Sequence, residues 1–407
     1  MPATRTPSQD LVVLAIGQAL TSTVGALLTA VSSLSGERLA PSPALSTLPV
    51  TATVLGALAM VYPASALMGR LGRRSGFMLK AVVGIAGGVL GGTALWAGSF
   101  ALLVLGTFLL GVFSAFGQYY RFAAIDAARD AGERTRAVSL VMGAGVAGGI
   151  AGPWLGERFS AWWPGAPYAG AFAALAAVCV ALAASQLFLS AQLGRQDAPP
   201  PADAARPAHP ARPTPLGADF YATTALCAIG FAVMTLVMNA APLAMHHDGH
   251  TMHASSMVLQ AHFALMYLPA FATPRLVARL GLRGLTAAGI AAGVAGGLLA
   301  QWPQQNFCLY LLELGLAGMA WSFLFNGGTL LSAQTYAPAQ RTRAQGINST
   351  LVYLANVAAA LAAGGLLHWQ GWATVNLACL PLLALAAWLL LRRPPPRKRS
   401  LPALEHP

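Results

Sequence analysis

Residues 67–74 read LMGRLGRR, and residues 276–283 repeat the pattern as LVARLGLR. Residues 134–137 and 341–344 both read RTRA, at nearly the same separation along the chain. Both copies of the first motif follow a long apolar stretch, and both copies of the second open one. Two motifs that recur at nearly one spacing predict that the chain consists of two homologous halves.

The composition excludes an ordinary soluble protein. Of the 407 residues, 56% are apolar and 9% are charged, and the mean hydropathy is +0.61. A soluble domain carries about 25% charged residues, so this chain cannot cover itself with a water-facing surface. A net charge of +12 could indicate nucleic-acid binding, but the basic residues are scattered between apolar stretches. We therefore expect a polytopic membrane protein in contact with the lipid bilayer and not with nucleic acid.

Twelve apolar stretches approach the length that crosses a bilayer, about 20 residues. In the first half these are 10–33, 44–68, 77–98, 100–120, 137–157 and 168–193. In the second half they are 219–245, 254–273, 284–302, 306–333, 346–367 and 372–391. Strands of a β-barrel would instead alternate in polarity over about 10 residues each, and these stretches are too long and too apolar for that. The expected fold is an all-α membrane protein with twelve transmembrane helices in two pseudo-symmetric six-helix halves.

The basic residues predict the orientation. If both termini are cytoplasmic, only Arg38 and Arg158 of the 24 lysines and arginines fall outside. Positively charged loops stay in the cytoplasm, so we expect cytoplasmic N- and C-termini. The first span lacks the flanks of a cleaved signal peptide, and we expect it to be retained.

The domain organisation follows from these spans. Residues 1–193 are expected to form the N-terminal half and residues 219–393 the C-terminal half. The stretch 194–218 is rich in proline and alanine, and proline interrupts helices, which predicts a flexible cytoplasmic linker. Residues 394–407 are expected to form a basic cytoplasmic tail.

The loop after the second span carries a gating motif, Ser65-x-x-x-Gly69-Arg70-x-Gly72-Arg73-Arg74. It resembles the G-x-x-x-D-R-x-G-R-R loop of the major facilitator superfamily, with Ser65 in place of the first glycine. Gly69 replaces the aspartate that helps to lock the cytoplasmic gate in that family. The resemblance implies the major facilitator fold and a secondary transporter rather than an enzyme.

A glycine motif in the fifth span has two interpretations. The pattern Gly148-x-x-x-Gly152-Pro153-x-x-Gly156 resembles a motif of antiporters in the same superfamily. The same spacing is also typical of a small-residue face on which two membrane helices pack.

Residues 234–266 concentrate sulfur and imidazole groups. This segment holds six of the 12 methionines and five of the 8 histidines. They are Met234, Met238, Met245, His246, His247, His250, Met252, His253, Met257, His262 and Met266. Thioethers and imidazoles suit soft cations, above all Cu(I), whereas magnesium, calcium and manganese prefer carboxylates.

Helical spacing groups five of the ligands. Residues four apart share a helix face, which pairs Met234 with Met238 and His262 with Met266. At 1.5 Å per residue, the two pairs lie at matching depths below the outer surface. Cys227 falls near the stripe of the first pair. A single methionine pair usually fills a core, but this depth-matched arrangement predicts a metal site.

The two pairs also resemble motifs of the CcoA-like copper importers, a branch of the major facilitator superfamily. The resemblance maps onto Met234, Met238, His262 and Met266. It implies copper uptake across the bacterial inner membrane for cytochrome oxidase assembly, with copper as substrate and no resident cofactor. Periplasmic or cytosolic copper chaperones would then be partners. A relative in this branch is associated with riboflavin uptake, so the motif leaves the substrate open.

Further candidates have two interpretations each. In the loop MHHDGHTMH at 245–253, four side chains could capture metal or could simply form a polar turn: His246, His247, His250 and His253. Glu313 is the acidic residue expected deep in a span, where a carboxylate marks either a proton carrier or a hydrogen-bonded structural group. We expect no basic residue at mid-depth, which disfavours an anionic organic substrate.

Two other functions stay open. One is uptake or proton-coupled efflux of a neutral organic solute such as riboflavin or a drug, bound in an apolar cavity. Its candidate side chains are Gln18, Asn239, Gln260, Trp321, Asn326, Tyr353 and Asn356. The other is a metal receptor that does not translocate, which a twelve-span repeat disfavours.

Overall fold

The computed structural model describes residues 7–117, 119–120, 123–124, 127, 131–190, 193, 215–303, 306–337 and 340–392. Within these ranges the regular structure is helical. The first half contains α1 (Pro7–Leu39), η1 (Pro43–Leu45), α2 (Leu48–Leu71), α3 (Arg73–Ala97), α4 (Phe100–Gly117), α6 (Ala131–Ser160) and α7 (Ala169–Gln186). The second contains α8 (Ala218–His247), α9 (Met252–Tyr267), α10 (Pro269–Leu299), α11 (Phe307–Ala333), α12 (Arg341–Leu377) and α13 (Cys379–Arg392). The expected linker lies outside the described residues except at 215–218, and the expected tail at 394–407 lies wholly outside them.

The all-helical fold is confirmed and its helices are compatible with the twelve expected spans, but two connections are tighter than expected. Gly281 has φ 68° and interrupts α10, so the eighth span comprises α9 and the first part of α10. Gly371 has φ 77° and likewise divides α12, so the twelfth span starts with the last turn of α12 and continues as α13. Both turns need positive φ, which glycine adopts without steric cost. Pro269 separates α9 from α10, because proline supplies no amide hydrogen to the helix.

Nine stretches of the described residues are long and apolar enough to cross a membrane by length and composition. The residues 346–392 form one such stretch although they contain two expected spans. The short α9 and the glycine-rich α6, which begins with charged residues, are the two expected spans that do not qualify alone. The chain is therefore a multi-pass membrane protein.

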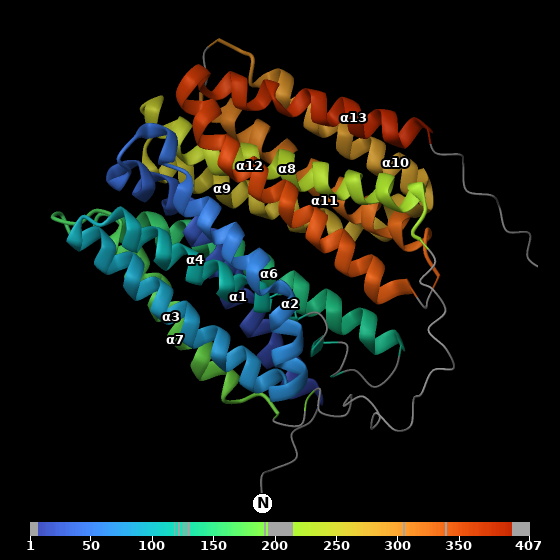
Figure 1. The fold of residues 1–407 in the computed structure, drawn as a ribbon, viewed down its shortest axis with the longest axis horizontal. Helices are drawn as coiled ribbons and strands as arrows, with labels where there is room; N and C mark the ends of the chain where they lie inside the picture. The colour runs from blue at the N-terminus through green and yellow to red at the C-terminus, as the bar shows by residue number, and fades with distance from the viewer. Residues whose placement is uncertain are drawn as a thin grey trace, which may run out of the picture.

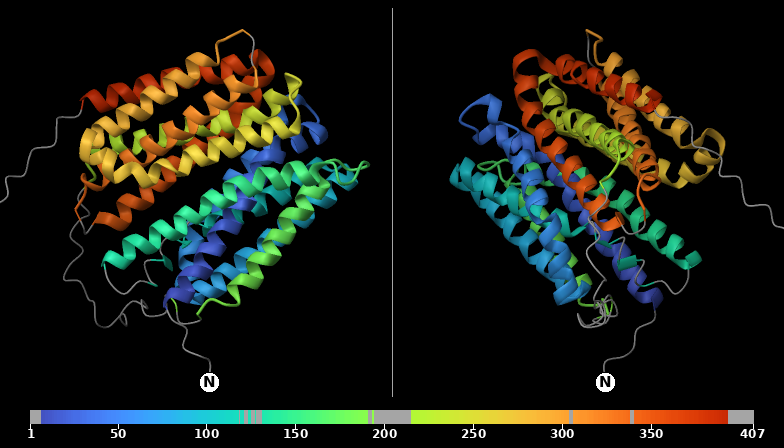
Figure 2. Two further views of the ribbon diagram at one scale, coloured as in Figure 1. Left: turned by 180° about the vertical axis from the view of Figure 1, so that it is seen from behind. Right: turned by 45° about the vertical axis from the view of Figure 1, so that its right-hand side comes forward.

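The two halves lie side by side as separate helix bundles (Figures 1 and 2). They pack against each other through α6 with α9, α2 with α12, and α1 with α8. The start of α1 and the end of α13 lie at one end of the molecule, toward which the two bundles diverge in Figure 1. We call this the inner end and the opposite one the outer end. The positive loops predict that the inner end faces the cytoplasm.

The glycine motif of the fifth span lies on the close interface between α1 and α6. A methyl group added at Gly152 would lie 2.6 Å from Ala26 Cβ and from Leu27 N on α1. One added at Gly148 would lie 2.6 Å from Thr23 N. Backbones this close leave no room for side chains, so these glycines serve packing between α1 and α6.

Candidate substrate-binding site

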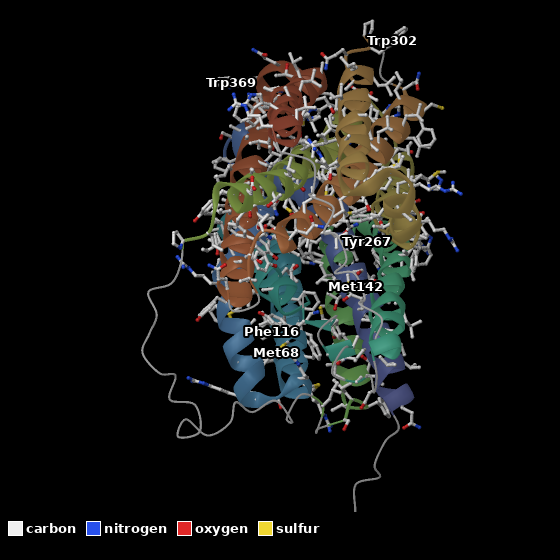
Figure 3. All side chains as sticks on the ribbon, turned by 90° about the vertical axis from the view of Figure 1, so that its right-hand side faces the viewer. Met68, Phe116, Met142, Tyr267, Trp302 and Trp369 are labelled. Atoms are coloured by element: carbon white, nitrogen blue, oxygen red, sulfur yellow. The ribbon has the colours of Figure 1, made fainter. Side chains whose placement is uncertain are left out.

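A cavity of about 260 Å³ lies between the two halves. Helices α1, α2, α4 and α6 of the first half and α8, α9 and α12 of the second contribute to its wall. Tyr267, at the end of α9, borders the cavity and lies where the two bundles meet (Figure 3). A cavity with walls from both halves is reshaped when the halves move, which suits alternating access.

Among the described residues, the cavity wall carries many polar side chains but no charged one. Its polar side chains are Gln18, Thr21, Ser22, Thr29, Ser32, Thr53, Ser114, Thr235, Asn239, Tyr267 and Asn356. Aromatic surface comes from Phe113 and Phe263 as well as Tyr267. Neutral hydrogen-bonding groups on an apolar and aromatic background are typical of sites for uncharged organic ligands.

Gln18 borders the cavity, and its side chain holds a buried acceptor that has no hydrogen-bond partner among the described residues. Its Nε2 donates to Ser22 Oγ at 3.3 Å, whereas its Oε1 is buried without a partner. A buried polar atom without a partner costs stability, so a solute with an N–H or O–H group would gain by donating to Oε1. On the opposite side, Thr235 Oγ1 donates to Asn356 Oδ1, which fixes the asparagine side chain.

The expected metal ligands are divided between two places. Met234 and Met238 both border the cavity, as expected for one stripe of α8. His262 is fully buried, and its Nδ1 lies 2.7 Å from the carbonyl oxygen of Leu314 on α11. Met266 is 7% exposed and does not border the cavity.

Cys227 also faces α11 rather than the cavity. Its Sγ lies 3.9 Å from the carbonyl oxygen of Phe325 and 3.8 Å from Thr329 Oγ1. Successive residues of a helix point about 100° apart, so Phe263 can border the cavity while His262, its neighbour, packs behind it. Within the described residues, no group of three or more histidine, cysteine, aspartate or glutamate side chains could hold a metal ion.

The four histidines of the outer loop do not converge. His247 and His253 each contact a different glutamate of the first half, Glu37 and Glu157. The ring of His250 packs edge-on against Tyr310 of α11, 5.6 Å between centroids. His246 is exposed, and its ring centroid is 6.4 Å from that of His247.

Glu313 is buried in α11 at 1% exposure, as expected, but outside the cavity wall. Its Oε2 accepts a hydrogen bond of 2.7 Å from Trp372 Nε1. Tyr310 packs on Trp372, and its hydroxyl donates to Asp248 Oδ2 at 2.7 Å. The carboxylate thus belongs to a polar network near the outer end of the C-terminal half.

Lys80 is the buried charge that the sequence interpretation missed. We expected it among the cytoplasmic basic residues, but it is 0% exposed on α3. Its Nζ donates to Thr21 Oγ1 at 2.5 Å and lies 4.4 Å from the ring centroid of Phe113 and 4.7 Å from that of Tyr120. Thr21 and Phe113 border the cavity, so the ammonium group stands directly behind the wall. The position of Lys80 could have indicated this burial, because it is the eighth residue of α3 and therefore lies well inside the helix.

The gating loop forms the tight connection between α2 and α3 at the inner end. Gly72 has φ 83° and is the single residue between α2 and α3. Arg73 Nη1 lies 3.9 Å from Met68 Sδ. Arg70 is exposed and Arg74 is half-buried, while Gly69 lies in the last turn of α2.

Of the candidates for a neutral solute, Gln18, Asn239 and Asn356 border the cavity. Gln260 and Asn326 bond to serines one turn away on their own helices. Trp321 stacks on Phe325 with centroids 5.2 Å apart, and its ring contacts Tyr267 edge-on. Tyr353 is partly buried on α12.

A twelve-helix membrane bundle of two six-helix halves around a central cavity is the architecture of a secondary transporter. The chain belongs to the Major Facilitator Superfamily, whose family model matches residues 14–300 and again 223–406.

The relatives agree with this assignment. The riboflavin transporter RfnT of Brucella anthropi is 34% identical over 391 residues, which cover 96% of each chain. The uncharacterized MFS-type transporter YdeG of Bacillus subtilis is 28% identical over 89% of this chain and 84% of its own. Among solved structures, the inward open conformation of the xylose transporter XylE from E. coli superposes with a TM-score of 0.73 at 14% identity, covering 96% of this chain and 97% of that one.

Proposed function

We propose that this transporter carries a neutral organic solute of the riboflavin type across the bacterial inner membrane. The observation that carries the proposal is the cavity wall, whose described residues combine hydrogen-bonding and aromatic side chains without a charged one. The similarity to a riboflavin transporter over nearly the whole chain supports the same class of solute.

The cavity chemistry matches the parts of such a molecule. A flavin is a planar ring system with an imide edge and a hydroxylated chain, and it is uncharged near neutral pH. Phe113, Phe263 and Tyr267 offer aromatic surface for the ring, since aromatic faces stack favourably. Gln18 Oε1 and the amide of Asn239 would bond to the imide and hydroxyl groups. We retain Glu313 as a candidate proton carrier that acts from outside the cavity.

The test is uptake of radiolabelled riboflavin by a riboflavin-auxotrophic bacterium that expresses the protein. Gln18→Ala and Asn239→Ala each remove a hydrogen-bonding group from the wall, and we expect uptake at limiting riboflavin to fall about 10-fold or more. Gln260→Ala is the matched control, because that amide bonds to Ser256 on its own helix and does not border the cavity. Uptake no higher than with empty vector, with the protein present in the membrane, would refute the proposal.

Copper is a second candidate because the thioethers of Met234 and Met238 both border the cavity. In this case His262 and Met266 would join them only after α9 turns. Met234→Leu and Met238→Leu conserve volume but remove sulfur. A copper carrier would lose copper accumulation in these variants, and a flavin carrier would keep riboflavin uptake.

A further inference from the structure

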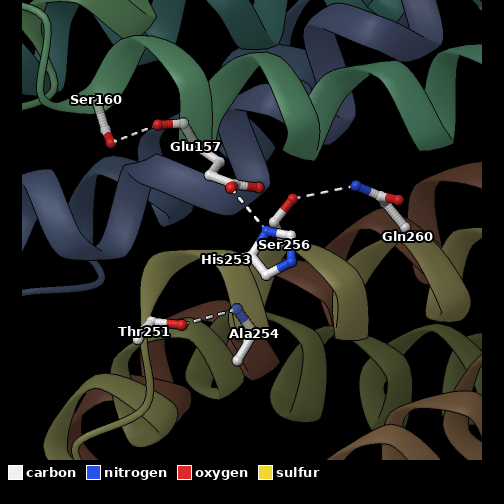
Figure 4. Close-up of polar contacts among 7 residues, drawn as sticks. All are labelled: Glu157, Ser160, Thr251, His253, Ala254, Ser256 and Gln260. Carbon is white, nitrogen blue, oxygen red and sulfur yellow. Dashed lines mark hydrogen bonds and ion pairs between the residues drawn. The ribbon is translucent and has the colours of Figure 1, made fainter.

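Two histidine–glutamate pairs join the halves at the outer end. His247 Nε2 of α8 lies 2.6 Å from Glu37 Oε1 of α1. His253 Nδ1 of α9 lies 2.8 Å from Glu157 Oε1 of α6 (Figure 4). In each pair the histidine comes from the C-terminal half and the carboxylate from the N-terminal half. Opening the outer end would therefore separate both pairs.

The helix ends make these contacts depend on charge. Glu37 lies in the last turn of α1, and His247 is the last residue of α8. The C-terminus of a helix carries partial negative charge, so a protonated His247 stabilises two helix ends as well as a carboxylate. Glu157 is close to the end of α6 and therefore also needs a nearby cation. With neutral histidines, the remaining cations in these last helix turns are Arg38 beside Glu37 and Arg158 beside Glu157.

Protons can reach these pairs without opening the transporter. The side chains of His247 and His253 are 49% and 68% exposed. Histidine is the side chain whose ordinary pKa lies between pH 5 and 8. The pairs can thus respond to the pH of the outer compartment in the closed state.

We propose that the pairs His247–Glu37 and His253–Glu157 are proton-binding latches that hold the outer gate closed in acid. Protonation of the histidines turns each contact into an ion pair and favours the conformation that is open to the inner side. Deprotonation removes the attraction, and the equilibrium shifts toward outer opening. This device depends on alternating access but not on the identity of the solute.

The other ionisable groups near the first latch are Arg38, Tyr168 and Asp248, together with histidines that serve as controls. Arg38, next to Glu37, stays cationic throughout. Burial raises the pKa of Tyr168, and the nearby Glu37 raises it further, so this phenol stays neutral. Asp248 accepts a hydrogen bond from Tyr310.

Three further groups complete the surroundings of the latches. Arg158 follows Glu157 and is exposed, and it also stays cationic between pH 5 and 8. Among the described residues, His246 and His250 bond to neither glutamate: the His246 ring lies beside that of His247, and the His250 ring packs on Tyr310.

The test measures the distance between the outer ends of the two halves by double electron–electron resonance. Nitroxide labels are attached to Ala161→Cys, just after α6, and to Trp369→Cys, near the end of the long segment of α12. Trp369 is 83% exposed, so the label does not disturb packing. Cys308, which is exposed, is replaced by serine, and the remaining cysteines are buried: Cys179, Cys227 and Cys379.

The protein is reconstituted in nanodiscs of neutral lipid without solute and measured from pH 5 to 8.5. An exposed ion pair changes an equilibrium by about 1.4- to 5-fold, so we expect two latches to change the ratio of closed to open outer gates roughly 2- to 25-fold. The longer distance should gain population as the pH rises. In the double variant His247→Gln, His253→Gln, this pH response should be lost.

Two further variants separate the latches from general effects. Glu37→Gln with Glu157→Gln should abolish the pH response in the same way, because the carboxylates are then uncharged. His246→Gln should leave the response intact. A wild-type distance distribution that is indifferent to pH, or an unchanged response in the double histidine variant, would overturn the proposal. Neither result depends on whether riboflavin is transported.

Discussion

The packing of α1 on α6 predicts a large effect from adding one methyl group. In Gly148→Ala and Gly152→Ala the new methyl would lie 2.6 Å from backbone nitrogens of α1, at Thr23 and Leu27 respectively. Neither nitrogen can rotate away as the end of a flexible side chain would. Ordinary contact between such atoms needs at least 3.4 Å, so the two helices must separate by about 1 Å.

Overpacking of this kind costs about 1–3 kcal/mol. Each half has the size at which 1 kcal/mol changes the unfolding midpoint by about 2–4 °C. We therefore expect each variant to lower the apparent Tm of the purified protein by roughly 2–12 °C, measured by tryptophan fluorescence in detergent. The double variant Gly148→Ala, Gly152→Ala should lose less than the sum, because one displacement of α6 relieves both contacts.

Two other glycines provide matched controls. A methyl at Gly156, the third glycine of the motif, would first meet side-chain atoms at 3.3 Å. A methyl at Gly25 of α1 would meet nothing within 4 Å. Both alanine variants should keep the wild-type Tm, or raise it through helix propensity. If all four single variants unfolded at the same temperature, the assignment of Gly148 and Gly152 to packing would fail.

Two further predictions concern buried polar groups. Lys80→Met removes a buried ammonium and keeps a side chain of similar volume. Replacing buried charges by apolar groups is often neutral or stabilising by about 1–4 kcal/mol, so we expect the apparent Tm to stay the same or rise. A fall of several degrees would show that the contacts to Thr21 and the two rings outweigh the cost of burial. Trp372→Phe removes the indole donor to Glu313 Oε2 and should cost about 1–3 kcal/mol, whereas Glu313→Gln should cost less because its amide oxygen still accepts. Equal Tm values for Trp372→Phe and the wild type would contradict the role of this bond.

Much of the architecture could be predicted from the sequence because a bilayer constrains backbone polar groups so strongly. Each span must form a helix, and its length is set by the membrane, so apolar stretches near 20 residues locate the helices. Local structure also depends on single residues: Gly72 lies between two helices at positive φ, a conformation that favours glycine. The buried position of Glu313 follows from its place inside the long apolar stretch 306–333.

Which side chains meet could not be predicted in the same way. Spacing places Met234 with Met238 and His262 with Met266, but the rotation of each helix about its axis decides which pair borders the cavity. The His262 ring packs against α11, since α9 turns Phe263 toward the cavity instead. The histidines of the outer loop looked like one cluster in the sequence, and the docking of the halves gives two of them separate glutamate partners.

The sequence by itself determined the membrane class, the two halves, the number of spans and the expected orientation, because these depend on local hydrophobicity and on the distribution of charge. The tertiary structure decided the chemistry of the cavity, the burial of Lys80 and the contacts that close the outer end. These features join residues from distant helices, and their positions depend on how side chains of different spans pack together. No local pattern encodes that packing, because each helix presents several faces and only its neighbours select among them.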